Sequence, residues 1–144
     1  MLELPQPNST TDIYLLEPRI KDKYFRYSNN LGFISAAHDA EIAHAFSHWS
    51  FEASKHRVMI TDLQGTHEGK AFTLTDPAVH CPVDVVRFNT TTNQGMPGIE
   101  AVLNTHECGP TCKALGLPSA SKLTRAQASM GSLAGYFEDL LIFD

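Results

Sequence analysis

The sequence predicts an α+β fold, in which a small sheet of short strands packs with separate helices. The first observation is the run Ala36–Phe51, where apolar residues recur at the three- and four-residue spacing of an amphipathic helix. The second is a set of short β-type runs, among which Arg57–Thr61 resembles a buried strand. The third is the length, because 144 residues fit one domain that buries roughly two thirds of its unfolded surface.

Composition narrows the partners that we expect. The formal net charge is −5, whereas a nucleic-acid-binding surface needs clustered Lys and Arg. No apolar run reaches the length of a membrane span, and the polar residues 1–11 are unlike a signal peptide. Three cysteines are an odd number, which suits free thiols in a reducing compartment. We therefore expect a cytoplasmic protein with neither nucleic acid nor membrane as a partner.

The N-terminal part is predicted to contribute two strands. Residues 1–11 show no periodicity, and we expect them to be disordered. Asp12–Glu17 has a strong strand pattern that ends at Pro18, because proline cannot donate to a β-ladder. Lys21–Tyr27 alternates charged and aromatic residues as a half-exposed strand does, and the turn Ser28–Gly32 follows it.

The helix predicted over Ala36–Phe51 has Ser35 or Asp39 available as a cap. Its apolar face consists of Ile42, Ala45, Phe46 and Trp49. We expect Trp49 and Phe51 to lie in the core, since large aromatic side chains dominate the apolar area that a domain buries.

The rest of the chain is predicted to hold short elements joined by polar turns. The strand Arg57–Thr61 delivers Asp62, Gln64 and Gly65 to a turn. The segments that follow are a polar loop at Thr66–Gly69, a strand at Lys70–Leu74, a strand or extended connection at Val83–Phe88, a loop at Thr90–Gly98, and helices at Ile99–Thr105 and Thr111–Leu115. The tail Ser119–Asp144 is either a helix with one apolar face or a poorly ordered terminus.

Three possible metal ligands, His106, Cys108 and Cys112, occur within one turn-rich stretch. Structural zinc takes four tetrahedral N or S ligands, so the fourth ligand has to be a distant histidine. His48, just before the buried strand, is a better candidate than His44 or His80. The alternative is a pair of buried free thiols beside an unrelated histidine. The histidines that we expect at the surface are His38, His44, His56 and His67.

A second group of polar residues lies at predicted strand ends and turns. The oxygens of Asp62, Gln64 and Asp76 are of the kind that holds Mg²⁺ or takes a hydroxyl proton, although each residue alone is more simply a solvated or capping side chain. The loop Asn93–Gly98 can present backbone N–H groups to an anion. It lacks the Lys-Ser or Lys-Thr of a Walker loop, and an ordinary turn-rich loop is the simpler interpretation.

Five motifs in a fixed order give a family resemblance. They are Ala-Phe-Ser-His-Trp-Ser-Phe-Glu (45–52), Thr-Asp-Leu-Gln-Gly (61–65), Leu-Thr-Asp-Pro (74–77), Asn-Gln-Gly-Met-Pro-Gly (93–98) and His-Glu-Cys-Gly-Pro-Thr-Cys (106–112). This order resembles the α-kinases, atypical Ser/Thr protein kinases related to the elongation-factor-2 and myosin-heavy-chain kinases. Leu16–Pro18 and Phe25–Asn30 match the hinge of that family and the stretch after it, so the resemblance covers about residues 12–118.

The resemblance implies a role for each matched residue. The ligands of a structural zinc ion would be His48, His106, Cys108 and Cys112. Asp62 would be the catalytic residue that takes or orients the substrate hydroxyl, and Gln64 and Asp76 would be ligands of Mg-ATP. The other cofactor-binding residues would be Glu17 and Leu16 beside the adenine, and Asn93, Gly95 and Gly98 in a glycine-rich loop.

The resemblance also indicates what is missing. A complete α-kinase domain has an N-terminal lobe with a phosphate-covering loop and a lysine that grips ATP, whereas this chain starts essentially at the hinge strand. We therefore expect an α-kinase C-terminal lobe at residues 12–118 with the N-terminal lobe largely absent, followed by an unmatched tail at 119–144. Two functions fit: a protein Ser/Thr kinase, weakly active unless another chain supplies the missing lobe, or a non-catalytic, zinc-stabilised, pseudokinase-like binding module.

Overall fold

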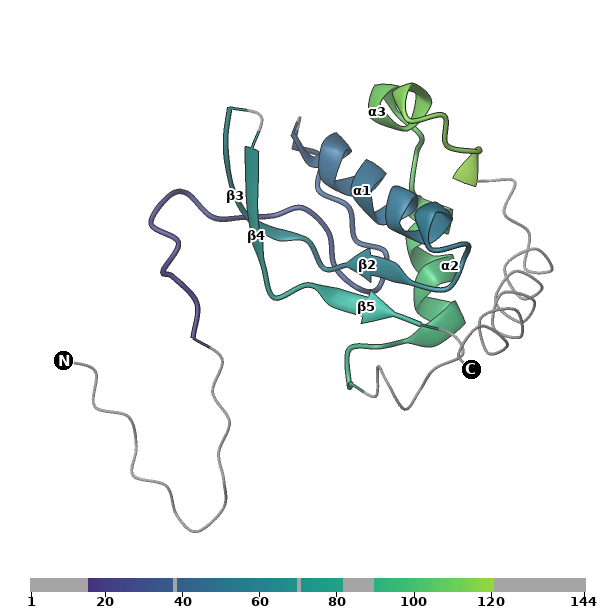
Figure 1. Cartoon of the computed structure of the whole chain (residues 1–144), viewed down its shortest axis with the longest axis horizontal. Coiled ribbons are helices and arrows are strands. Elements are labelled where there is room, and N and C mark those ends of the chain that lie inside the picture. Colours follow the sequence, from purple (N-terminus) through teal and green to yellow (C-terminus); the bar gives the residue numbers. More distant parts are fainter. Residues whose placement is uncertain (1–15, 38, 70, 82–89, 121–144) are drawn as a thin grey trace, which may run out of the picture.

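A computed structural model describes residues 16–37, 39–69, 71–81 and 90–120, and Figure 1 shows how their elements are arranged. Within these residues the strands are β1 (Phe25–Arg26), β2 (Met59–Thr61), β3 (Gln64–Glu68), β4 (Ala71–Thr75) and β5 (Ala78–His80). The helices are α1 (Ala40–Ala53), α2 (Gly95–Thr105) and α3 (Pro110–Ala114). This mixture of separate strands and helices confirms the α+β prediction for the described part of the chain.

The strands form two small antiparallel sheets, one in the order β1–β3–β4 and the other pairing β2 with β5. After α1 leads from β1 to β2, the chain crosses directly between the sheets in the β2–β3 connection and in the β4–β5 connection. Gln64 pairs with Thr75 on one side of these connections, and Thr61 pairs with Ala78 on the other. Because both connections are bracketed by the same two pairs, they lie side by side.

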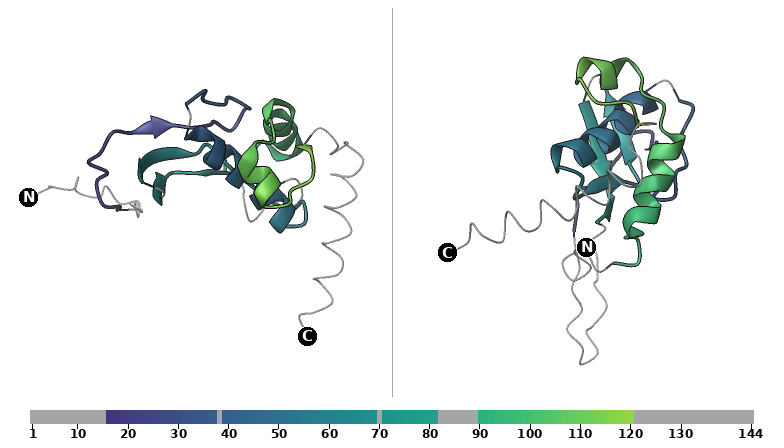
Figure 2. Two further views of the ribbon diagram at one scale, coloured as in Figure 1. Left: turned by 90° about the horizontal axis from the view of Figure 1, so that it is seen from above. Right: turned by 90° about the vertical axis from the view of Figure 1, so that its right-hand side faces the viewer.

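The helices pack around the second sheet. α1 contacts β2, α2 contacts β5, and α3 contacts α1. Figures 1 and 2 show α2 and α3 at one end of the molecule and the β3–β4 hairpin toward the other. Two clusters of buried side chains hold these layers together. One contains Phe51, Met59, Ile99, Leu103 and Ala120, and the other contains Tyr27, Ala40, Ala43 and Leu63.

Several predicted strands and loops differ from the structure. β3 replaces the polar loop predicted at Thr66–Gly69, because a central strand gains its pairing from two neighbours and needs no apolar sequence. β4 confirms the predicted strand at Lys70–Leu74 within one residue, and β2 lies inside the predicted Arg57–Thr61. β5 was not predicted, and β1 is shorter than Lys21–Tyr27.

The helix prediction was right about the element and wrong about its buried face. α1 begins four residues later than predicted, and Phe51 is buried as expected. Trp49 and Ile42, however, are 43% and 46% exposed. Small residues and Ser occupy most of the buried face, because α1 packs closely against β2 and α3.

Other predictions have mixed outcomes. α2 begins at Gly95, inside the predicted loop, and α3 falls within one residue of the predicted helix. Leu16 and Glu17 belong to no strand, and the remainder of the predicted strand at 12–17 lies outside the described residues, as do Val83–Phe88 and residues 121–144. Among the helices of the described ranges, none combines the length and the apolar character that crossing a membrane requires.

Candidate functional site

The four predicted metal ligands, of which only His48 is distant from the others in sequence, meet at one end of the molecule. His48 lies on α1, Cys112 lies on α3, and His106 and Cys108 lie in the connection between α2 and α3. One ligand atom from each residue falls within 4.8 Å of all the others. His48, which was predicted as the distant fourth ligand, is buried at this position.

The separations between these atoms match a tetrahedral site. His48 Nδ1 is 3.8 Å from the sulfur of Cys108 and 3.8 Å from that of Cys112, and His106 Nε2 is 3.3 Å from Cys112 Sγ. A tetrahedron with metal–sulfur bonds of about 2.3 Å and metal–nitrogen bonds of about 2.0 Å has edges of roughly 3.5 Å. The four residues can therefore hold one metal ion with little rearrangement.

Burial sets the protonation states of the ligand group. It lowers the pKa of His106 to about 4, with a smaller contribution from neighbouring His48, so this ring is neutral and able to donate to a metal. It raises the pKa of Cys112 to about 11, with Cys108 adding to the shift. Without a metal Cys112 is therefore a thiol at neutral pH, and metal binding has to release its proton.

Two carboxylates of α1 flank the ligand group. Glu41 accepts hydrogen bonds from the Thr111 backbone N–H at 2.9 Å and from the Thr111 hydroxyl, which fixes the start of α3. A side chain at Gly109 would meet the Glu41 carboxylate and displace it, so glycine permits this close approach. One turn after His48, Glu52 Oε1 lies 3.9 Å from His48 Nε2. Neither glutamate was predicted, because an acidic residue on a helix gives no sequence signal that distinguishes it from a solvated one.

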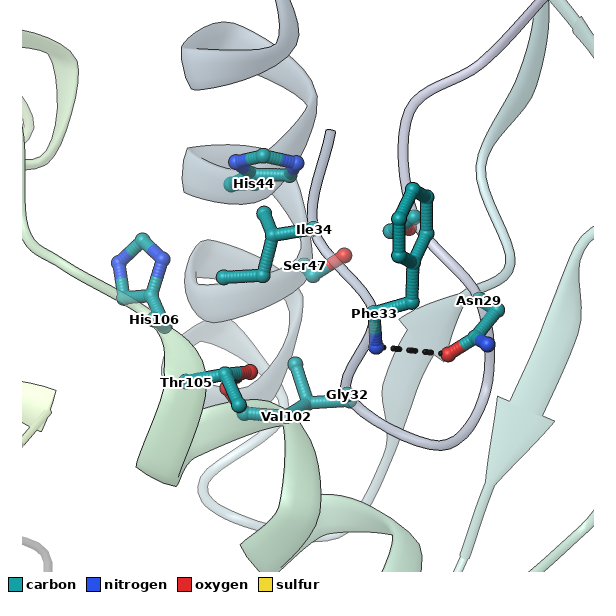
Figure 3. A pocket seen from close by; sticks show the side chains of 10 residues that line it. Asn29, Gly32, Phe33, Ile34, His44, Ser47, Val102, Thr105 and His106 are labelled. Atoms are coloured by element: carbon teal, nitrogen blue, oxygen red, sulfur yellow. Dashed lines mark hydrogen bonds between the residues drawn. The ribbon is translucent and has the colours of Figure 1, made fainter. Parts of the chain in front are cut away.

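A small cavity lies beside the ligand group, between α1, α2 and the turn at residues 28–34 (Figure 3). Its volume is about 10 Å³, room for about one water molecule and far below that of a ligand pocket. The turn is held by a hydrogen bond of 2.8 Å from the Phe33 N–H to Asn29 Oδ1. Ser47, on the cavity wall, has a buried hydroxyl with no hydrogen-bond partner among the described residues. The cavity is therefore a candidate hydration site and too small for a nucleotide.

The predicted catalytic and magnesium residues meet at the junction of the two sheets. Asp62 lies in the β2–β3 connection, Asp76 lies in the β4–β5 connection, and Gln64 begins β3 beside Thr75. Both aspartates have a positive φ, 55° and 49°. This left-handed conformation is uncommon outside glycine and clusters at functional sites. The fold therefore brings together three residues that the sequence separates by up to fourteen positions.

Arg26 of β1 adds a cation to this junction. Its Nη2 lies 3.0 Å from Asp62 Oδ1, and the arginine side chain is 54% exposed. Glu17 lies nearby, because its Oε2 accepts a hydrogen bond of 2.6 Å from the Thr75 hydroxyl, next to Asp76. Leu16 is 79% exposed. Sequence reasoning placed Glu17 here only through the family resemblance and did not find Arg26.

The loop residues Asn93, Gly95 and Gly98 lie at the opposite end of β5. Asn93 Oδ1 accepts hydrogen bonds from the backbone N–H groups of Cys81 and Gly95, at 3.0 and 2.9 Å. Asp76 and Cys81 are five residues apart along an extended segment, which spans roughly 16 Å. The described structure therefore does not bring the loop residues into contact with the two aspartates, and the Asn93 side chain is engaged with backbone groups.

His80 is the buried residue that sequence reasoning passed over. Its Nε2 lies 2.9 Å from the Asn30 carbonyl oxygen, and its Nδ1 accepts the Gln94 N–H at 3.1 Å. A Cβ on Gly98 would lie 2.6 Å from His80 Nε2, so the glycine is needed for this close packing. His80 was considered only as a metal ligand, and its position at the end of the unpredicted β5 explains why its role was missed.

Some predicted surface histidines are partly buried. His44 Nε2 lies 2.8 Å from the Tyr27 carbonyl oxygen, and His67 Nδ1 lies 3.3 Å from the Tyr27 hydroxyl. His56 lies over the Phe51 ring, with 4.8 Å between the ring centres. Polar neighbours in sequence did not reveal these contacts, because each depends on pairing between segments or on the turn after α1. His38 lies outside the described residues.

Comparison with known families gives one clear result. A family model described as the Alpha-kinase family matches residues 2–112. Alpha-protein kinase vwkA of Dictyostelium discoideum is 38% identical over 102 residues, which cover 71% of this chain and 16% of that protein. Eukaryotic elongation factor 2 kinase of Homo sapiens is 31% identical over 105 residues, or 73% of this chain and 14% of that protein.

Solved structures agree with the sequence relatives. An α-kinase from Entamoeba histolytica superposes with a TM-score of 0.66 at 33% identity, covering 71% of this chain and 38% of that one. The α-kinase domain of myosin heavy chain kinase A in complex with AMPPCP gives a TM-score of 0.63 at 28% identity, covering 72% of this chain and 38% of that one. The chain thus spans well under half the length of these relatives.

Proposed function

Because the chain belongs to the α-kinase family, we propose that it transfers the ATP γ-phosphate to Ser or Thr of a protein. Asp62 is the proposed catalytic residue. The observation that carries this proposal is the convergence of Asp62, Gln64 and Asp76 at the sheet junction. Relatives named as protein kinases support it, as does a structural neighbour crystallised with AMPPCP.

Each residue at the junction has a proposed task. Asp62, held by Arg26, takes or orients the proton of the substrate hydroxyl. Gln64 and Asp76 offer oxygen atoms to Mg²⁺, which neutralises the phosphate charge when Mg-ATP is bound. Phosphoryl transfer depends almost entirely on positioning and electrostatic stabilisation. Asp62 and Asp76 suit this task, because both are carboxylates held in a left-handed backbone conformation at the same junction.

The remaining cofactor contacts are proposals from the family resemblance. Leu16 and Glu17 are assigned to the adenine side of the site, and Glu17 already lies against Thr75 beside Asp76. Asn93, Gly95 and Gly98 are assigned to phosphate or peptide handling through backbone groups of the loop, because the Asn93 side chain is used internally. For these loop residues and the two aspartates to act on the same substrate, that substrate has to extend along β5.

We assign the metal centre at His48, His106, Cys108 and Cys112 to structural zinc. Two neutral imidazoles and two cysteines at tetrahedral separations are a common zinc ligand set. All four positions are filled by protein side chains, which is typical of a structural site, whereas a catalytic zinc keeps one position for water or substrate. The metal therefore stabilises the domain and takes no part in phosphate transfer.

Full activity is proposed to need an N-terminal lobe, supplied by another chain or by further sequence. The described residues contain Asp62, Gln64 and Asp76, whereas the resemblance assigns the phosphate-gripping lysine to that lobe. Removing one preorganised charge-stabilising group costs on the order of 10²–10³ in rate, so this chain alone is expected to be a weak catalyst.

Transfer of labelled phosphate from ATP to a generic Ser/Thr protein substrate tests the proposal. The zinc-loaded chain is compared with Asp62→Asn, Asp76→Asn and a control, Asp22→Asn, which removes the same charge from an exposed site. We expect labelling to fall at least about 10²-fold in the first two variants and to remain in the control. Equal labelling by Asp62→Asn and the parent would refute the catalytic assignment.

The same assay with an α-kinase N-terminal lobe added in trans tests the proposed need for that lobe. We expect the added lobe to raise the labelling rate of the parent and to have little effect on Asp62→Asn. A folded, zinc-loaded chain that labels nothing under either condition would contradict the kinase proposal and favour the non-catalytic binding module.

A further inference from the structure

α1 presents three polar residues to the metal-ligand segment along one line. Glu41 lies two turns before His48 and Glu52 one turn after it, which places all three on the same helical face. Glu41 holds the start of α3 through Thr111, and His48 Nδ1 faces both cysteine sulfurs. This face therefore organises the metal centre, and Glu52 is its one member without an assigned task.

One ring nitrogen of His48 lacks a hydrogen-bond partner among the described residues. Its Nδ1 is the atom directed at the ligand group, so when a metal binds there the ring proton has to sit on Nε2. Nε2 is fully buried and has no hydrogen-bond partner among the described residues. A buried N–H donor of this kind is unfavourable unless an acceptor approaches it.

Glu52 offers that acceptor. Its Oε1 is 3.9 Å from His48 Nε2, just beyond hydrogen-bond distance, and its side chain is mostly buried. The same oxygen lies 3.2 Å from His56 Nε2, in the turn that follows α1. A carboxylate oxygen can accept two hydrogen bonds, so the contact with His56 holds the carboxylate next to His48 without using it up.

We propose that Glu52 is a positioning residue of the metal centre, which accepts the Nε2–H of His48 and so fixes the ring with Nδ1 toward the metal. Metal-bound histidines commonly donate their second N–H to a carboxylate, and this contact increases the basicity of the ligand. The small movement required, from 3.9 Å to hydrogen-bond distance, is a side-chain adjustment within one turn of a helix.

Zinc affinity of the full chain is the direct test, measured by competition with a chromophoric chelator at constant pH. Glu52→Ala and Glu52→Met both remove the oxygen acceptor, and both residues are strong helix formers. We expect each to raise the zinc dissociation constant about 10- to 100-fold. Glu52→Gln should lose less, because its amide oxygen can still accept the Nε2–H. Glu68→Gln, an equal charge change at an exposed position of β3, is expected to leave the affinity unchanged.

A spectroscopic readout separates positioning from general destabilisation. With Co²⁺ in place of zinc, we expect the thiolate charge-transfer and d–d bands of Glu52→Ala to shift or broaden, while circular dichroism shows the same helix content as the parent. Unchanged affinity and spectra in folded Glu52→Ala and Glu52→Met would overturn the proposal.

The inference rests on the proposed zinc site and does not depend on kinase activity. A parent chain that binds no zinc would refute both the zinc assignment and the role of Glu52. A parent that binds zinc tightly, with variants that bind it equally well, would refute the role of Glu52 alone. The phosphate-transfer assay bears on neither result.

Discussion

His80 connects three segments through a single neutral ring. One ring nitrogen meets the Asn30 carbonyl and the other accepts the N–H of Gln94, at the start of α2. The tautomer is therefore fixed: Nε2 carries the proton and Nδ1 is the acceptor. A second proton on Nδ1 would face the Gln94 N–H and break that contact. Burial accordingly lowers the pKa of His80 below its ordinary value of 6.5.

This shift predicts a pH dependence of stability. Below about pH 6.5 the unfolded chain binds a proton on His80 that the folded chain refuses, so the free energy of unfolding falls as pH decreases. In zinc-loaded protein, we expect the stability difference between the parent and His80→Gln to narrow from pH 7 to pH 5. The slope of this narrowing is limited to about 1.4 kcal/mol per pH unit, the value for one proton. Urea unfolding at several pH values measures it.

A control variant separates the titration of His80 from a general loss of stability. Trp49→Ala leaves every histidine in place, so its stability should differ from that of the parent by an amount that does not change with pH. Parallel curves for His80→Gln and the parent would mean that His80 is protonated equally in both states, against the geometry described above.

At the scale of elements, the apolar residues of α1 lie on two different sides of the helix, of which only one faces the core. Its aromatic flank, with Phe46 stacked on Trp49 at 5.8 Å between ring centres, lies at the surface beside α3. Its opposite side carries Phe51 into the core cluster with Met59 and Ile99. The two aromatic residues Trp49 and Phe51 are two positions apart and face different surroundings.

Truncating these two residues should have unequal costs. We expect Phe51→Ala to lower the free energy of unfolding by about 3–5 kcal/mol, because it leaves a cavity in the core. Trp49→Ala should cost about 1 kcal/mol or less, since much of the indole is already in water. Urea denaturation of the zinc-loaded variants measures both values. Equal losses would indicate that the Trp49 face is covered in solution.

Sequence patterns predicted the helices and strands better than they predicted which face of a helix is buried or which strands pair. The strand at 57–61 and the helices were predictable because their local periodicity is strong. The buried face of α1 was not, because small residues that permit close packing carry no hydrophobic signal. β3 was missed for a related reason, since its stability comes from β1 and β4 on either side and not from its own polar sequence.

At the scale of the molecule, the predicted site residues fall into two groups. The motif order suggested all of them, but only tertiary structure brings Asp62 beside the β4–β5 connection that carries Asp76, while holding Asn93 at the far end of β5. Arg26, Glu41 and Glu52 could not be found from sequence, because each acts through a contact with a residue at least four positions away. Three of the four predicted metal ligands were the most predictable, since His-x-Cys-x-x-x-Cys is a local pattern, whereas His48 was assigned through the family resemblance.

The proposed metal site joins α1 to the end of α2 and to α3, elements that also meet in the core cluster and through Glu41 and Thr111. His48 belongs to α1, which is packed on β2, whereas the other three ligands follow α2 or lie on the five-residue α3. A helix this short is not stable by itself, so its position depends on Glu41, Cys112 and the metal. The proposed metal site therefore adds to the core cluster and to the Glu41–Thr111 contact in holding the C-terminal part of the described chain to α1.

Removing zinc should therefore unfold this part of the molecule. Structural zinc contributes apparent binding free energies of about 10–16 kcal/mol in small domains, as large as the net stability of about 5–15 kcal/mol of a typical protein. We expect a chelator to lower the melting temperature sharply and to expose the Cys108 and Cys112 thiols to a thiol reagent. Added zinc should restore both readouts.

Cys81→Ala should keep the chelator response, because Cys81 lies outside the ligand group, whereas Cys112→Ala should melt equally with and without chelator. An unchanged melting curve of the parent after complete zinc removal would show that the fold does not depend on the metal.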